Sequence, residues 1–122
     1  MNLKPMIITI IRGTDKGDGS TEKQKIKAEG DARIGLAIHQ STKLGTKLLV
    51  KNLWVITHIK SGRSVLRGMR SKESAISYLA KILEVCSDWT FTLEEYAKLD
   101  DETRGALKEY MDLLQREVYV RP

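Results

Sequence analysis

The stretch THIKSGRSVLRGMR, residues 57–70, decides the fold. Aliphatic and β-branched residues on either side of Ser61 and Gly62 predict two strands joined by a tight turn. A two-residue loop would place Lys60 directly opposite Arg63, and like charges that face each other across two strands are destabilising. We therefore predict a three-residue loop with Gly62 in the left-handed conformation, which glycine adopts without strain.

This loop predicts which side chains share each face of the hairpin. The expected pairs are Ile59 with Arg63, Thr57 with Val65, Ile56 with Leu66 and Trp54 with Gly68. Trp54 would then cover the bare backbone at Gly68. Arg63 and Arg67 are expected on one face, and His58 and Arg70 on the other. The hairpin is thus predicted to be covered on both sides rather than to present one basic stripe.

The residues before this hairpin have the composition of strands and loops. Lys4–Arg12 is rich in β-branched residues, and glycine-rich Arg12–Gln24 predicts a flexible loop or a long hairpin connection. A second strand is expected to begin at Lys25–Ala28, and Lys43–Lys51 is expected to form another. Ala32–Gln40 fits either a strand or a helical turn.

The C-terminal part is predicted to be helical. Ser71 is a suitable N-cap, and apolar residues recur at helical spacing as far as Cys86. Thr92–Glu95 has the pattern of a capping box, and Phe91 with Tyr96 fits the hydrophobic staple that accompanies such a box. A second helix is therefore expected to begin there.

This second helix is expected to break near Leu99–Asp101 and to restart with Asp100 as its cap. The tail, Val118–Pro122, is expected to leave the helix and to pair as a short strand or pack on a partner. Residues 1–122 are thus predicted to form a single α+β domain. An N-terminal antiparallel β-sheet of about five or six strands occupies residues 1–70, and two C-terminal helices follow in residues 71–117.

Charge is distributed unevenly along this chain of net charge +5. Residues 1–72 hold 15 Lys and Arg against 5 Asp and Glu, whereas residues 73–122 hold 6 against 11. A basic first part suggests an anionic ligand. Attraction between the two parts, within one chain or across a dimer, explains the asymmetry equally well.

Several classes of protein are disfavoured by composition and motifs. No apolar run approaches the roughly 18 residues of a membrane span, and the only cysteine, Cys86, suits a reducing cytoplasm. Gly13–Ser20 has no lysine at the position that a phosphate-binding loop requires, beside Gly19 and Ser20, and glycines stand where calcium ligands would be needed. His39 and His58 have no metal-binding spacing to Cys86. We expect no metal, no cofactor and no enzymatic activity.

The remaining candidates for chemistry are basic and aromatic residues. Arginine suits phosphate because its planar guanidinium binds two oxygens at once. The candidate ligand-binding residues are Arg12, His58, Lys60, Arg63, Arg67, Arg70, Phe91 and Arg104. A solvated surface would have a similar composition. We expect a pocket where one face of the hairpin meets a helix or a second chain, and Arg63 and Arg67 are the first pair to test.

Two stretches, Trp54–Arg70 (WVITHIKSGRSVLRGMR) and Ser71–Trp89 (SKESAISYLAKILEVCSDW), place a basic antiparallel sheet ahead of two helices. This layout, which covers most of the chain, resembles that of the phage anti-Thoeris sponge proteins. The resemblance implies a cytoplasmic protein that sequesters a cyclic nucleotide defence signal of the cyclic ADP-ribose type without turnover. It also implies a pocket lined by arginine and an aromatic residue, and a homo-oligomer, dimeric or larger.

Two other functions fit the same residues. The basic sheet could bind nucleic acid, although aromatic residues make up only 6% of the chain and no recognition helix is evident. Alternatively, the acidic helical part could dock a basic partner or another copy, as in a small protein-interaction or inhibitor module.

Overall fold

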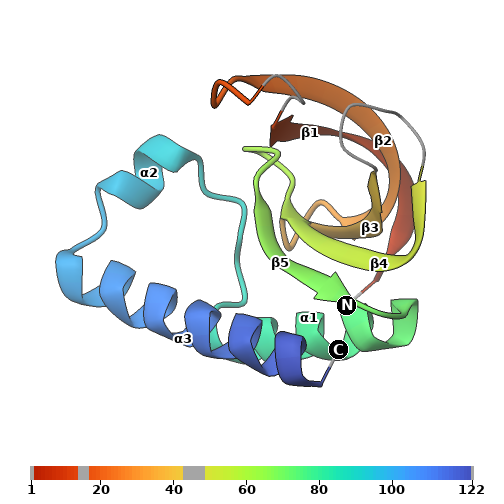
Figure 1. The fold of residues 1–122 in the computed structure, drawn as a ribbon. Coiled ribbons are helices and arrows are strands. Elements are labelled where there is room, and N and C mark those ends of the chain that lie inside the picture. The colour runs from red at the N-terminus through yellow and green to blue at the C-terminus, as the bar shows by residue number, and fades with distance from the viewer. Residues whose placement is uncertain (1, 14–16, 43–48, 122) are drawn as a thin grey trace.

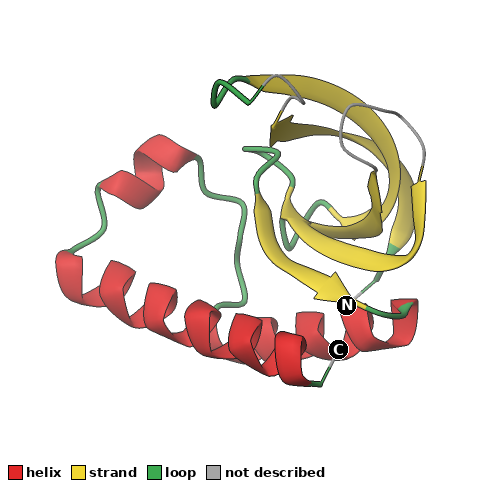
Figure 2. Cartoon of the chain, viewed as in Figure 1, coloured by secondary structure: helices red, strands yellow, loops and turns green. Residues whose placement is uncertain are grey.

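The computed structural model describes residues 2–13, 17–42 and 49–121, and within these ranges five strands precede three helices (Figure 2). The strands are β1 (Lys4–Gly13), β2 (Thr21–Asp31), β3 (Leu36–Thr42), β4 (Leu49–His58) and β5 (Ser64–Met69). The helices are α1 (Lys72–Val85), α2 (Leu93–Ala97) and α3 (Asp101–Val120). The predicted α+β class and the order of sheet and helices are confirmed.

The strands form one antiparallel sheet in the order β1-β2-β3-β4-β5. The sheet curls so strongly that β1 approaches the turn between β4 and β5 (Figure 1). There the Ile11 N–H donates to the Gly62 carbonyl over 2.9 Å. The curl gives the sheet an inner and an outer face, and successive residues of a strand alternate between them.

Each face of the sheet has its own apolar core. The inner core consists of Ile8, Ile10, Ile26, Ala28 and Ala37. The outer core lies between the sheet and the helices, and it contains Leu36, Ile38, Ile56, Leu66, Met69, Ala75, Tyr78, Leu79, Ile82, Trp89, Leu114 and Val118. Helices α1 and α3 pack on β3, β4 and β5, so the outer face of β1 and β2 lies beyond the helical layer (Figure 1).

The turn between β4 and β5 has Gly62 in the predicted left-handed conformation, but it is longer than the predicted three-residue loop. Gly62 has φ +71°, as predicted. Two main-chain hydrogen bonds close the loop, from His58 N–H to the Arg63 carbonyl and from Gly62 N–H to the His58 carbonyl. The predicted Ile59–Arg63 pair is therefore wrong, and the Ile59 N–H donates instead to the Gly35 carbonyl.

The register of the hairpin is also only partly as predicted. The observed pairs are Trp54 with Met69, Val55 with Arg67, Ile56 with Leu66 and Thr57 with Ser64. The Ile56–Leu66 pair is confirmed, whereas Thr57 with Val65 and Trp54 with Gly68 are wrong. Two irregularities in the pairing each insert a residue on β5, and such bulges shift every residue beyond them.

Gly68 is covered by α3 rather than by Trp54. Its φ is +88°, and a Cβ atom placed there would lie 3.7 Å from the side chains of Val118 and Tyr119. The bulge thus lets the end of α3 approach the strand closely.

The earlier strands differ from the prediction mainly in their bounds. β2 begins at Thr21, so the connection before it is shorter than Arg12–Gln24, and residues 14–16 of that connection lie outside the described residues. The ambiguous stretch Ala32–Gln40 contains a turn and then β3. Residues 43–48 of the predicted strand Lys43–Lys51 are likewise outside the described residues, and β4 begins at Leu49.

The helices begin at the capping residues that were predicted from the sequence. Ser71 Oγ accepts from the Ser74 N–H, and the reciprocal Thr92–Glu95 capping box is present. Asp100 caps α3, which confirms the predicted break. The predicted departure of the tail at Val118 is wrong, because α3 continues to Val120 with Val118 fully buried in the outer core.

Candidate functional site

The segment between α1 and α2 is held against the sheet by Trp89. Its main-chain N–H donates to the Ile34 carbonyl over 2.7 Å, and its indole Nε1–H donates to the Cys86 carbonyl over 2.8 Å. Gly35 makes this approach possible, because a Cβ at that position would lie 2.2 Å from the Trp89 carbonyl oxygen. The segment is thereby fixed beside the end of β4, where it places Phe91.

Phe91 joins the hairpin to α2 through aromatic contacts. Its ring stacks on His58 with the centroids 5.0 Å apart, and on Tyr96 with the centroids 5.6 Å apart. Trp89 meets Phe91 at 5.5 Å and His58 edge-on at 6.4 Å. The predicted Phe91–Tyr96 staple is confirmed, and the four rings form one continuous cluster that spans three elements of the fold.

These rings line a groove of about 240 Å³ between the β4–β5 turn and the two C-terminal helices, which we call the aromatic groove. Its lining residues are His58, Ser61, Arg63, Ser64, Val65, Trp89, Phe91, Leu93, Tyr96, Leu107, Lys108 and Met111. The set contains aromatic and aliphatic side chains, two strong cations and no carboxylate. Such a combination suits a ligand with an apolar planar part and an anionic part.

Arg63 and Lys108 are the two cations that line the groove. Arg63 is exposed, and neither residue takes part in an ion pair among the described residues. Lys60 lies near the same end, since its charge lowers the pKa of His58, Asp88 and Glu95. Lys60 therefore lies close to two carboxylates, whereas Arg63 and Lys108 are the cations that line the groove itself.

His58 is a buried side chain held in place by the turn. It is only 4% exposed, and its Nδ1 lies 2.7 Å from Ser61 Oγ. Burial is the main cause that lowers the pKa of His58, the charge of Lys60 lowers it further, and main-chain groups of Trp89 and Phe91 act in the opposite direction. Its Nε2 is buried and makes no hydrogen bond of standard geometry within the described ranges.

The contact between Ser61 and His58 resembles a nucleophile and its base, but the surroundings indicate a structural role. Ser61 Oγ also accepts from the Arg63 N–H over 3.2 Å, which holds the turn. Catalytic pairs of this kind need a third group that orients the imidazole. No carboxylate among the residues lining the groove supplies one.

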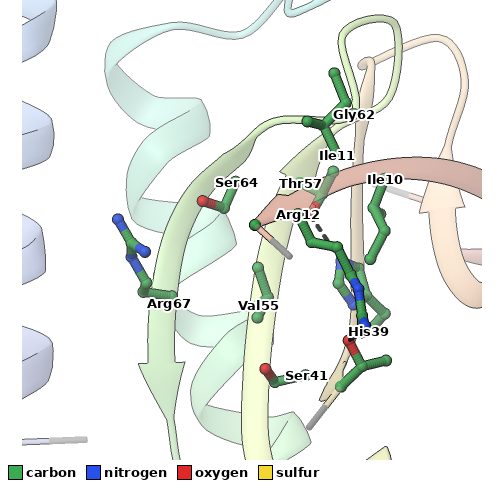
Figure 3. Close-up of a pocket in the computed structure, with 12 residues that line it drawn as sticks. Ile10, Ile11, Arg12, His39, Ser41, Val55, Thr57, Gly62, Ser64 and Arg67 are labelled. Carbon is green, nitrogen blue, oxygen red and sulfur yellow. Dashed lines mark hydrogen bonds between the residues drawn. The ribbon is translucent and has the colours of Figure 1, made fainter. Parts of the chain in front are cut away.

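A second concavity, which we call the polar hollow, lies between β1 and β5 on the inner side of the curl and has a volume of about 360 Å³. It is lined by Ile10, Ile11, Arg12, Gly13, His39, Ser41, Thr42, Val55, Thr57, Gly62, Ser64 and Arg67. Figure 3 shows Arg12 alongside His39, whereas Arg67 points away from both. Arg12 is already engaged, because its Nε donates to Glu22 over 2.9 Å and one terminal nitrogen to Thr42 Oγ1 over 2.8 Å.

His39 lies at the back of the polar hollow and is fully hydrogen-bonded. Its Nδ1–H donates to the Gln40 carbonyl over 2.9 Å, so its Nε2 accepts from the Thr57 hydroxyl at 2.7 Å. Burial lowers the pKa of His39, and the Gln40 hydrogen bond opposes this shift. His39 is thus a satisfied structural histidine.

The eight predicted site residues are distributed over several places. His58, Arg63 and Phe91 meet in the aromatic groove, and Lys60 lies near it. Arg12 and Arg67 line the polar hollow instead, so Arg63 and Arg67 do not share a site. Arg70 is exposed just before α1, and Arg104 pairs with Asp101 on α3.

Sequence reasoning missed the contribution of α3 to the groove. Leu107, Lys108 and Met111 come from this helix, and no local pattern tells that their side of α3 faces the hairpin. Tyr96 was recognised only as part of the staple. The i, i+4 spacing of Leu107 and Met111 marks an apolar side of the helix, but it does not show which element that side meets.

Comparisons with other proteins give no further guide to the site: no family model, curated protein or solved structure matches the chain. Among the described residues, no group of three or more His, Cys, Asp or Glu is placed to hold a metal ion. No helix in these ranges is both long and apolar enough to cross a membrane.

Proposed function

We propose that this chain is a non-enzymatic binding protein for a small ligand that carries a phosphate and a planar ring, such as a nucleotide. The observation that carries the proposal is the aromatic groove, which combines four aromatic rings with Arg63 and Lys108 and contains no carboxylate. The planar part would lie against the Phe91 and Tyr96 rings, and the phosphate would bind the two cations.

The aromatic groove supports this proposal better than the polar hollow does. In the hollow, Arg12 is already paired with Glu22, so a phosphate would have to compete with a carboxylate. In the groove, Arg63 meets no such competitor among the described residues. A cation without an internal partner gives a larger net gain when it binds an anion.

The test is a binding titration followed by Trp fluorescence, with Trp89 as the reporter in the groove. The probes are adenosine mono- and diphosphate, a cyclic nucleotide as the resemblance implies, and inorganic pyrophosphate. Arg63→Ala is expected to weaken nucleotide binding roughly 10- to 100-fold, the value of a charge-assisted hydrogen bond. The matched control is Arg116→Ala, since Arg116 is an exposed arginine on α3 outside the groove.

A second variant separates the two parts of the ligand. Phe91→Leu keeps an apolar side chain but removes the aromatic stacking surface. It should therefore weaken the binding of nucleotides and leave the binding of pyrophosphate unchanged. The bound nucleotide should be recovered chemically intact by mass spectrometry. The proposal fails if no nucleotide changes the fluorescence or raises the melting temperature of the wild-type protein.

A further inference from the structure

Lysines recur at every second residue along β2, at positions 23, 25 and 27. Because strand residues alternate between faces, these three side chains project from the same face. Ile26 and Ala28 between and after them are buried in the inner core, so the lysines lie on the outer face. All three are exposed. We call Lys23, Lys25 and Lys27 the lysine row.

The row lies on the part of the outer face that the helices do not cover. The helices pack on β3, β4 and β5, and β1 and β2 extend away from α3 as a paired ribbon (Figure 1). Across this ribbon the lysines pair with Ile11, Thr9 and Ile7, none of which is charged. The three lysines therefore lie on a strand face against which α1 and α3 do not pack.

The positive charge of the lysine row is also not neutralised by ion pairs within the described part of the chain. None of its lysines forms an ion pair within the ranges that the structure describes. The two nearest acids on β2 are engaged elsewhere, Glu22 with Arg12 and Glu29 with Lys72. Glu22 moreover alternates to the other face, whereas Glu29 shares the face of the row and is paired with Lys72. Three like charges held in line repel one another, and an anion alongside them would relieve that repulsion.

The spacing of the row identifies the kind of anion. Alternate residues of a strand are about 6.8 Å apart, so the row is about 14 Å long. A single small phosphate cannot bridge that length, whereas a nucleic-acid strand presents a phosphate about every 3.4 Å along the helix axis. A two-stranded ribbon also has a shape that fits the major groove of B-form DNA.

We propose that the outer face of the β1–β2 ribbon binds the phosphate backbone of duplex nucleic acid through Lys23, Lys25 and Lys27. An anionic membrane fits this face less well, because Ile7, at 68% exposure, is the only large apolar side chain among the described residues that projects from it with more than half of its surface exposed. Contacts to phosphate alone carry no sequence information, so the binding is independent of base sequence. This site is separate from the aromatic groove, and neither proposal depends on the other.

The experiment is a fluorescence-anisotropy titration of a labelled DNA duplex of about two helical turns, between about 50 and 200 mM salt. The wild-type chain should bind in the micromolar range with a steep salt dependence. The triple variant Lys23→Gln, Lys25→Gln, Lys27→Gln should reduce the slope of log K against log salt by about 2.7, since each lost phosphate contact removes about 0.9.

The matched control removes the same charge elsewhere, through Lys51→Gln, Lys98→Gln and Arg116→Gln, all at exposed positions. It should leave the slope unchanged. The proposal is overturned if both triple variants lose affinity equally, because net charge alone would then account for binding. Absence of wild-type binding, or preference for phosphatidylserine vesicles over the duplex, would overturn it as well. Thermal melts of both variants establish that the fold is retained.

Discussion

The two histidines show how little a residue's type says about its state. Only His58 was a candidate for ligand binding, yet both side chains are engaged: His39 is saturated with hydrogen bonds and His58 is stacked on Phe91. Each is 4% exposed. Burial disfavours the charged imidazolium and is the main cause that lowers the pKa of both residues. Their common effect is therefore on the stability of the protein rather than on a reaction.

The lowered histidine pKa values predict that the protein loses stability in mild acid. A pKa that is lower in the folded chain means that the unfolded chain binds more protons as the pH falls below about 6.5. The free energy of unfolding should therefore be independent of histidine titration above about pH 7. Below that it should decrease by up to about 1.4 kcal/mol per pH unit for each histidine.

Urea denaturation at about pH 7.5 and pH 5.5 checks this sign, in the interval where a histidine of ordinary pKa titrates. The variant His39→Gln, whose amide can still accept from the Thr57 hydroxyl, should lose less stability between these two pH values than the wild type. An equal loss in both proteins would show that carboxylates, and not the buried histidines, control the acid sensitivity.

At the scale of elements, the capping residues in the sequence correctly predicted where the helices begin. Ser71, Thr92 and Asp100 cap helices because their side-chain oxygens accept from main-chain N–H groups that have no partner inside the helix. These interactions span three residues, so the sequence alone contains them. The tail was mispredicted because its helical state depends on Val118 packing against the sheet.

Helix α2 depends on its cap more than the other helices do. It has only five residues, none of them buried, so packing contributes little to holding it. Thr92→Ala should cost about 1 kcal/mol, which appears as local fraying rather than global unfolding. Amide exchange at Glu95 and Tyr96 should accelerate about fivefold. Ser87→Ala, at an exposed position outside both helices, is the control. An unchanged exchange rate would mean that the Phe91–Tyr96 contact alone holds α2.

At the scale of the whole molecule, the sequence predicted the class and order of the elements but not where their faces meet. The strand periodicity and the caps are local signals. The register of the β4–β5 hairpin is not, because one of the two bulges on β5 lies at Gly68, against the end of α3, which is distant in the sequence. Non-local packing also places Arg63 and Arg67 at different concavities and brings Lys108 to the same groove as Arg63. Hence His58 and Arg63 could be named from the hairpin sequence as candidates, whereas the residues of α3 that line the same groove could not.

The end of α3 contributes to the outer core and lies against β5 at Gly68, and this packing can be tested with two neighbouring valines. Val118 is fully buried and lies against Gly68, whereas Val120 is 78% exposed. Val118→Ala should lower the free energy of unfolding by about 2 kcal/mol, through lost burial and the small cavity that remains.

Val120→Ala removes the same atoms from an exposed position and should change the stability by less than about 0.5 kcal/mol. Urea denaturation of both variants measures the difference. Equal small effects would mean that the tail leaves the helix, as its sequence first suggested. A large effect confined to Val118 would instead mean that the last turn of α3 is helical and packs against β5 beside the bulge at Gly68, as the structure shows.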